Sequence, residues 1–258
     1  METSMPVDVQ ICVADGLIYE GLDYADRIEQ RLTRAGLTCG RLDLQTDLAG
    51  EAAHRPRPAL AYVFTGGQTS VHSDAAWMRR TIELMRTLIA EAHGMHGGAG
   101  GDGPGPVVIG VCLGSQLIAE ALRSDSIIDT SGIEVGLTAV TRVGASDRRT
   151  GGDEGIGFVP SFHYQAISPR IEEVDGVCIE YGNGHTSVQA LSYGERVFGC
   201  QFHPELTADD MRRLIDFNKD VITRWNGDAA AARWSVEEYQ DKLSDDLFDR
   251  LVIDRIRV

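Results

Sequence analysis

Cys112 is the residue whose surroundings most clearly predict chemistry. It lies in the run Gly-Val-Cys-Leu-Gly-Ser-Gln (residues 110–116), which follows an apolar, strand-like run and leads into a helix-like stretch. A cysteine on such a sharp strand-to-helix turn exposes its sulfur, and the positive end of the helix dipole favours the thiolate. Gly110 and Gly114 suit a tight turn that leaves little room for side chains. The pattern therefore predicts that Cys112 is a nucleophile.

A second block supplies a base and an acid. His203, Pro204 and Glu205 follow an apolar strand-like run, about ninety residues after the cysteine. In an extended segment residues two apart point to the same face, so we expect His203 and Glu205 to lie side by side. The carboxylate would hold the imidazole tautomer and stabilise its cation, while the other ring nitrogen reaches Cys112. Pro204 lacks an N–H and fits the end of a strand. These residues predict a Cys-His-Glu triad.

Together with a third block, these motifs resemble the class I (triad-type) glutamine amidotransferase family, in a pattern near that of the glutaminase domain of GMP synthase. The third block, Tyr-Val-Phe-Thr-Gly-Gly-Gln-Thr-Ser-Val at residues 62–71, resembles the family's strand and Gly-Gly-Pro-x-Ser-Val loop. The resemblance implies an oxyanion hole made by the backbone N–H groups of Gly67 and Leu113, with Gly66 in the substrate site. Gln68 stands where the family usually has proline, which predicts a less rigid loop. The resemblance covers roughly residues 7–225.

Further residues are candidates for substrate binding. Gln116 lies one helical turn past Cys112, so its amide can reach the space beside the thiol, unless it faces solvent. In the family the matching glutamine helps to bind substrate glutamine. Residues 161–167, Ser-Phe-His-Tyr-Gln-Ala-Ile, resemble the family segment whose backbone recognises the amino-acid end of the substrate. This implies roles for His163 and Tyr164, although Gln165 replaces an aspartate common in GMP synthase relatives.

Composition excludes several classes of function. The 258 residues carry a net charge of −15, which argues against binding to nucleic acid or anionic membranes. No apolar run approaches the roughly 18 to 20 residues that span a bilayer. The start of the chain lacks signal-peptide features, and the five cysteines form no Cys-x-x-Cys, which together predict a cytoplasmic protein with reduced thiols. Cys12, Cys178 and Cys200 lie in apolar settings and are expected to be buried. No metal site, nucleotide motif or cofactor is predicted.

Strand-like and helix-like runs alternate, which predicts an α/β fold. The resemblance implies a three-layer, flavodoxin-like, mostly parallel sheet with helices on both faces and a small antiparallel β element. Expected strands are 7–13, 40–44, 59–65, 106–109, 133–142, 176–180, 187–191 and 197–202, and expected helices are 24–35, 75–93, 116–122 and 208–225.

The remaining segments are assigned by composition. The glycine-rich stretch 93–106 is interpreted as a flexible insertion and not a phosphate loop, with His93 and His96 exposed. Residues 144–155 are expected to form a loop. The predicted organisation is one amidotransferase-like domain over residues 1–225 and a charged, helix-rich extension over 226–258, which packs on the domain or on a partner.

Three functions are compatible with these residues. The first is a glutaminase that hydrolyses glutamine and supplies ammonia to a separate synthase, because the chain contains no Walker-type loop or synthase domain. The second is a stand-alone hydrolase of γ-glutamyl conjugates, which a wide, open pocket would favour. The third is a degenerate relative with a binding or regulatory role, but it predicts the loss of a triad member, and all three residues are present.

Overall fold

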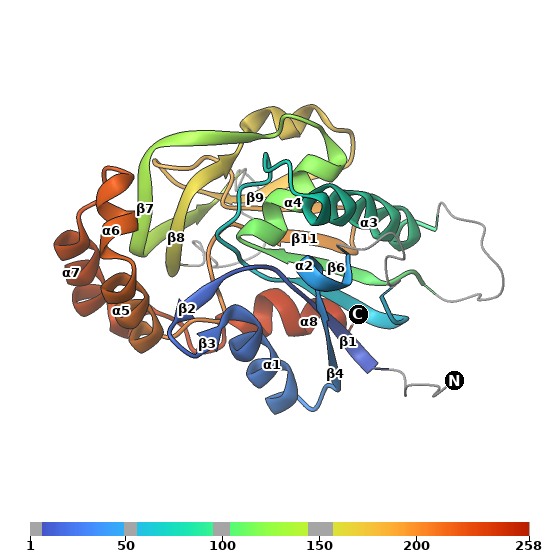
Figure 1. Cartoon of the computed structure of the whole chain (residues 1–258), viewed down its shortest axis with the longest axis horizontal. Helices are drawn as coiled ribbons and strands as arrows, with labels where there is room; N and C mark the ends of the chain where they lie inside the picture. Colours follow the sequence, from blue (N-terminus) through green and yellow to red (C-terminus); the bar gives the residue numbers. More distant parts are fainter. Residues whose placement is uncertain (1–6, 49–55, 95–103, 144–156, 258) are drawn as a thin grey trace, which may run out of the picture.

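A computed structural model describes residues 7–48, 56–94, 104–143 and 157–257. Its strands form a large sheet of nine strands and a separate hairpin (Figure 1). Five strands of the sheet are parallel, in the order β4 (Cys39–Asp43), β1 (Val7–Val13), β5 (Ala59–Phe64), β6 (Val107–Val111) and β11 (Val197–Cys200). Four antiparallel strands continue it, in the order β10 (Ala190–Tyr193), β9 (Val177–Gly182), β7 (Ile127–Arg142) and β8 (Gly157–Ile167). The hairpin pairs β2 (Leu17–Tyr19) with β3 (Leu22–Asp23). The predicted α/β fold is confirmed, and its antiparallel element extends the parallel part.

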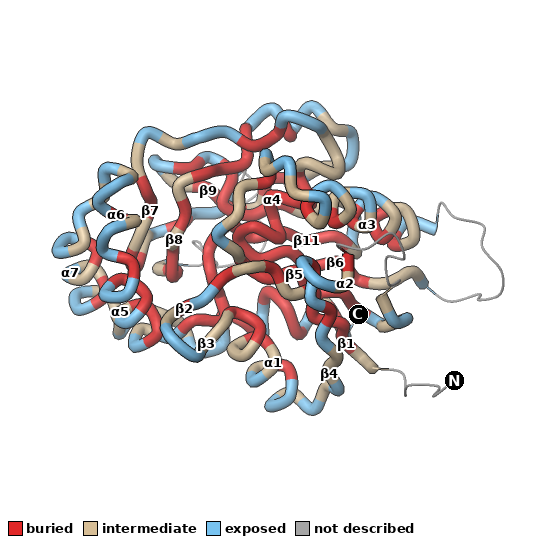
Figure 2. The backbone as a smooth tube through the Cα atoms, viewed as in Figure 1, coloured by how far each residue is buried: buried red, intermediate tan, exposed pale blue. Residues whose placement is uncertain are grey.

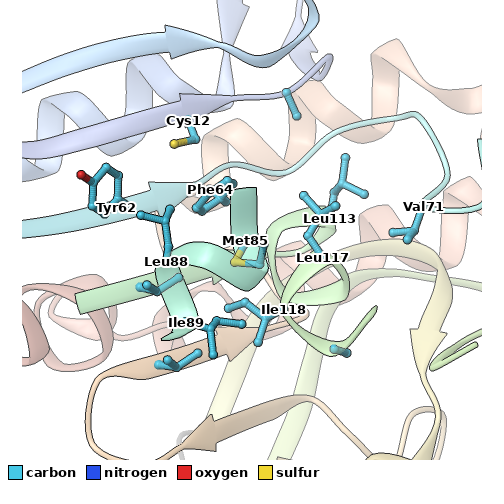
Figure 3. Close-up of a cluster of buried hydrophobic side chains, with 14 of the residues drawn as sticks. Cys12, Tyr62, Phe64, Val71, Met85, Leu88, Ile89, Leu113, Leu117 and Ile118 are labelled. Carbon is cyan, nitrogen blue, oxygen red and sulfur yellow. The ribbon is translucent and has the colours of Figure 1, made fainter. Parts of the chain in front are cut away.

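Helices cover both faces of the parallel strands (Figure 1). One face packs against α1 (Tyr24–Arg34), η3 (Asp249–Ile253) and α8 (Asp254–Ile256), and the other against α2 (Leu44–Asp47), α3 (Ala76–Ala92) and α4 (Leu113–Leu122). The alternation of side chains along a strand explains this arrangement. On β5, Ala61 and Val63 join the cluster under α1, whereas Tyr62 and Phe64 join the cluster under α3 and α4 (Figure 3). The buried residues fill the centre of the molecule (Figure 2).

Local signals explain where α1 begins and ends. Asp23 accepts a hydrogen bond from the Asp26 N–H, and the Asp26 side chain accepts one from the Asp23 N–H, which forms a capping box. After the helix, Gly36 has a φ of +83°, a left-handed conformation that favours glycine. The predicted helix at 24–35 is therefore confirmed within a residue.

Three helices form a cap on β7 and β8: α5 (Ala208–Phe217), α6 (Lys219–Arg224) and α7 (Ala229–Tyr239) (Figure 1). The prediction of one helix over 208–225 is wrong, because the chain breaks at Asn218. The Asn218 side chain donates to the Leu214 carbonyl oxygen at 3.0 Å, a local bond of the kind that competes with helical pairing. The break turns α6 relative to α5, and both helices reach the candidate site described below.

Other segments differ from expectation. The strand expected at 133–142 begins at Ile127, and β8 was not predicted as a strand. Two short 3₁₀ helices, η1 (Pro169–Glu173) and η2 (Gln240–Lys242), were also not predicted. Cys12 and Cys200 are buried as expected, but Cys178 is exposed, because β9 turns that side chain away from the core.

The C-terminal segment packs on the rest of the chain. Phe248 and Val252 are fully buried in the same hydrophobic cluster as Ile28 of α1, and α7 packs on β7. A domain boundary at residue 225 stays a prediction. The predicted loop at 144–155 and most of the glycine-rich stretch, including His96, lie outside the described residues, whereas His93 is exposed as expected. Over the described ranges, no helix is long and apolar enough to cross a membrane.

Candidate active site

Cys112 occupies the sharp turn between β6 and α4. Its φ of +51° and ψ of −105° are rare for a residue with a side chain, and such strain is typical of functional sites. Its N–H donates to the Cys200 carbonyl oxygen at 2.8 Å, which fixes the turn against β11. A Cβ on Gly110 would lie 2.3 Å from Gly114, and one on Gly114 would lie 2.4 Å from a backbone oxygen of β5. Both glycines are therefore needed for this close approach.

His203 and Glu205 lie side by side after β11. The chain turns here, with the Leu206 N–H donating to the His203 carbonyl oxygen at 3.2 Å, so the expectation of an extended segment is wrong. The turn nevertheless brings Nδ1 of His203 within 2.8 Å of Oε1 of Glu205. The two side chains are 1% and 0% exposed, so this interaction is shielded from water.

The surroundings of His203 favour its protonated form. Burial lowers the pKa of His203, but the negative groups of Glu205 and Cys112 outweigh burial and raise the pKa to about 10. Within the described residues Nε2 makes no conventional hydrogen bond. The nearby sulfur of Cys112 nevertheless helps to raise the pKa of the ring. The Tyr24 ring stacks on the imidazole with a centroid distance of 4.6 Å and an interplanar angle of 16°. Tyr24 thus fixes the plane of the ring.

The Gly66–Gly67 loop lies against the same groups. A Cβ on Gly66 would be 2.7 Å from Cε1 of His203 and 3.6 Å from Cβ of Cys112. A Cβ on Gly67 would be 2.6 Å from Cδ2 of Leu113. In the described part of the chain, the N–H groups of Gly67 and Leu113 donate to no other group. Two free donors beside the cysteine can stabilise a developing oxyanion, although this role stays a prediction.

Asp15, a residue that sequence reasoning missed, holds this loop. Its carboxylate accepts from the Gln68 N–H at 3.1 Å and the Thr69 N–H at 3.2 Å, and from the Thr69 hydroxyl. A proline at position 68 would have no N–H to donate. Gln68, where the sequence resemblance leads us to expect a proline, therefore contributes a hydrogen bond to Asp15 that a proline could not donate.

One cavity of about 210 Å³ opens beside Cys112. Its walls come from the glycine loop, α4, β8, and the cap helices α5 and α6. It is lined by Tyr24, Gly67, Gln68, Thr69, Cys112, Gln116, Phe162, His163, Tyr164, Gln165, Leu214, Asn218, Val221, Arg224 and Trp225. Cys112, Gly67, Gln116, His163 and Tyr164 therefore lie together in this lining, whereas Gly66, Leu113, His203 and Glu205 lie outside it. The roles assigned to these residues stay predictions.

The three predicted substrate-binding side chains differ in their surroundings. Gln116 is buried, and its Nε2 donates to the Gln165 carbonyl oxygen at 3.1 Å, so the solvent-facing alternative is wrong. Tyr164 donates from its hydroxyl to the Gln68 carbonyl oxygen at 3.0 Å, and its ring stacks on Trp225 at 4.3 Å. The cap helices are therefore tied to the glycine loop through Tyr164.

His163 belongs to a buried polar network that the sequence did not reveal. Its Nε2 lies 3.1 Å from Oε2 of Glu134, a carboxylate that also accepts from side chains of Asn183, Thr186 and Gln189. Burial raises the pKa of Glu134, but His163 and the other partners outweigh burial and lower it to about 2. Glu134 is therefore an anion that fixes His163 in the wall of the cavity.

A carboxylate also lies beside Gln165, which the sequence resemblance sets at the position of an aspartate in GMP synthase relatives. Asp129 of β7 accepts a hydrogen bond from Nε2 of Gln165 at 2.9 Å. The pairing of β7 with β8 sets Asp129 opposite Gln165. The neighbouring strand thus brings negative charge to this part of the site.

Arg224 is a further cavity residue that sequence reasoning missed. It is exposed at the end of α6, and among the described residues it has no ion-pair partner. Nothing in the local sequence pointed to it, because only the break at Asn218 brings α6 to the cavity. As for metals, no cluster of three or more His, Cys, Asp or Glu side chains within the described ranges could hold an ion.

Part of the sequence and the fold as a whole are similar to known proteins. Residues 104–221 match the family model described as glutamine amidotransferase class-I. A glutamine amidotransferase from Thermotoga maritima has a similar structure, with a TM-score of 0.71 and 18% identity over 97% of this chain and 99% of that one. A glutamine amidotransferase from Methylobacillus flagellatus gives a TM-score of 0.61 and 16% identity over 95% of this chain and 96% of that one.

A protein from Thermoplasma acidophilum, described as a putative GMP synthase subunit, gives a TM-score of 0.52 and 19% identity over 84% of this chain and 98% of that one. At these identities the likeness concerns the fold, and no curated protein sequence gives a significant match. The resemblance drawn from the sequence is confirmed to this extent: residues 104–221, a little under half of the chain, match the class-I glutamine amidotransferase model, and nearly the whole chain shares its fold with solved glutamine amidotransferases.

Proposed function

We propose that the protein is a glutaminase of the class-I amidotransferase type, with Cys112 as nucleophile, His203 as acid and base, and Glu205 as the group that orients His203. The observation that carries this proposal is the convergence of three separate segments. The strained cysteine turn and the glycine loop line one cavity, and His203 of the buried His203–Glu205 pair lies directly behind the glycine loop. If one of these segments had only a structural role, the other two segments would not need to lie beside it.

The geometry supports a two-stage reaction. The Cys112 thiolate attacks the side-chain amide carbon of glutamine, and the carbonyl electrons move onto the oxygen, where the Gly67 and Leu113 N–H groups stabilise them. His203 gives a proton to the leaving nitrogen, so ammonia departs and a γ-glutamyl thioester remains. Water then attacks the thioester and passes a proton to His203, the C–S bond breaks, and glutamate and the thiolate are released.

The cavity suits a small amino acid. Its volume of about 210 Å³ is below the roughly 300–1,000 Å³ typical of pockets for drug-sized ligands, which favours glutamine over a bulky conjugate. Gln116 uses its amide N–H groups within the protein, and no described residue donates to its Oε1. Oε1 is therefore free to accept a hydrogen bond from a substrate N–H. Arg224 supplies a positive charge that can pair with the substrate's carboxylate.

The ammonia is proposed to pass to a separate synthase. Free ammonia is mostly protonated at neutral pH and then no longer a nucleophile, so a direct transfer preserves its reactivity. The protein is proposed to act in the cytoplasm, where its five free cysteines stay reduced.

The test is the release of ammonia and glutamate from glutamine by the purified chain, beside Cys112→Ala. Release by the unmodified chain and not by the variant supports the proposal. Release from a panel of γ-glutamyl conjugates, with none from glutamine, would replace it by the γ-glutamyl hydrolase function. Release that persists in Cys112→Ala would contradict both.

A further inference from the structure

Gln201 reaches the nucleophile from a fully buried position. It lies two residues before His203, its side chain is 0% exposed, and its Nε2 is 3.6 Å from Sγ of Cys112. The sulfur also lies 3.9 Å from the Phe162 carbonyl oxygen, which can only accept a hydrogen bond. That oxygen favours the thiol over the thiolate. A hydrogen-bond donor to the sulfur has the opposite effect and favours the thiolate.

The orientation of the Gln201 amide follows from its neighbours. The Gln165 carbonyl oxygen is an acceptor only, so the NH₂ group of Gln116 must face it, at 3.1 Å. The same NH₂ group lies 3.2 Å from the Gln201 side chain, and therefore meets its oxygen. With its oxygen engaged, Gln201 presents its NH₂ group to Cys112. The orientation assigned to both side-chain amides thus rests on the backbone carbonyl of Gln165, whose oxygen cannot be confused with a nitrogen.

The network continues away from the nucleophile. The Gln165 carbonyl oxygen also faces Nδ1 of His163 at 3.2 Å, and His163 is held in turn by Glu134. A carbonyl oxygen has two lone pairs, so it can accept from both His163 and Gln116. The carbonyl that sets the direction of the two amides thus also contacts the His163 ring, which lies beside the carboxylate of Glu134.

We propose that Gln201 is a further catalytic residue, whose amide N–H donates to the sulfur of Cys112 and stabilises the thiolate, and that Gln116 is the positioning residue that orients this amide. The inference deepens the proposed glutaminase and rests on its nucleophile. The bond is charge-assisted when the sulfur is ionised, and the low dielectric of a buried site strengthens it. His203 supplies the proton, and Gln201 supplies a fixed dipole that persists after His203 has given that proton away.

The experiment measures the rate of iodoacetamide alkylation of Cys112 against pH in the full chain, without substrate. The rate is determined separately for each cysteine by mass spectrometry, because Cys178 is exposed and Cys39 half-buried. In Gln201→Met, which keeps the approximate volume and loses the donor, the midpoint pH of alkylation is expected to rise by about one unit, a size typical of one lost hydrogen bond to a charged group.

A second variant covers the case in which Gln201→Met fails to fold. In Gln116→Met, which adds no charge, the Gln201 oxygen loses its donor and the Gln201 amide loses its fixed orientation, so the midpoint is expected to rise as well. The control is Gln10→Met, which removes another buried amide, on β1. Its midpoint is expected to equal that of the unmodified chain.

The outcomes separate this inference from the proposed function. A raised midpoint in the Gln201 or Gln116 variant, with Gln10→Met unchanged, supports the donor role even if glutamine is not the substrate. Unchanged midpoints in folded Gln201→Met or Gln116→Met overturn it, even if the chain releases ammonia from glutamine. A rise of equal size in Gln10→Met would show a general effect of lost buried amides and would also overturn it.

Discussion

Replacement of Gly66 by alanine tests the packing around His203. Gly66 is not one of the glycines with a positive φ, so its backbone accepts an alanine. The added Cβ would lie 2.7 Å from Cε1 of His203, and ordinary contact begins at 3.4 Å, so the ring must move by 3.4 − 2.7, about 0.7 Å. Tyr24 stacks on the ring and Glu205 binds Nδ1, so this movement disturbs both contacts.

The size of the effect follows from this displacement. A misplacement of about 1 Å at a catalytic group can cost about 100-fold in rate, so we expect kcat for glutamine to fall by roughly 100-fold with little change in KM. Overpacking should also lower the free energy of unfolding by about 1–3 kcal/mol. The matched control is Gly184→Ala, because a Cβ at Gly184 would meet no atom within 4 Å.

The assay combines glutamine turnover with thermal unfolding of both variants. The expected result is a folded Gly66→Ala protein with strongly reduced turnover, beside a Gly184→Ala protein that behaves like the unmodified chain. Full turnover by Gly66→Ala would refute the reasoning, because it would mean that the position of His203 does not limit the reaction. A slow Gly184→Ala protein would show that the assay responds to glycine replacement in general.

Three further predictions concern the other parts of the site. Asp15→Ala removes the acceptor of the Gln68 and Thr69 N–H groups, and should lower kcat by about tenfold in the turnover assay, whereas Asp43→Ala on β4 should not. Arg224→Met should raise KM for glutamine by about tenfold with kcat kept, and Lys219→Met on the same helix should leave KM unchanged. The pKa of Glu134 is lowered from 4.5 to about 2, so this carboxylate contributes about 3 kcal/mol of stability above pH 4.5, which is lost as the pH falls toward 2. Denaturant unfolding of Glu134→Gln should lack this acid dependence, and an equal loss of stability in both proteins would contradict the assignment.

Much of the parallel part of the sheet could be predicted from the sequence. The runs 7–13 and 59–65 are rich in apolar residues and each follows a proline, and both form strands with buried residues. The motif around Cys112 also predicted the strand-to-helix turn, because only small residues at 110 and 114 permit it. These features depend on residues that are close together along the chain.

The features that were missed depend on contacts between distant segments. Asp15 follows β1, and it meets the glycine loop only because β1 pairs with β5 in parallel. The general rule that loops after adjacent parallel strands share one edge of the sheet could have suggested it. Glu134 and Gln201 carry no local signal, since their partners lie about fifty and ninety residues away. The bend at Asn218 was hidden by a continuous helical pattern of apolar residues.

The central claim is that Cys112 carries the γ-glutamyl group during turnover. The most direct measurement is mass spectrometry of the protein after rapid acid quenching in the presence of glutamine, with Cys112→Ala as control. We expect the mass of one γ-glutamyl group on the peptide that contains Cys112, and more of it in His203→Asn, where hydrolysis of the thioester lacks its base. Turnover of glutamine with no adduct on Cys112 in either protein, or an adduct on another residue, would contradict the account.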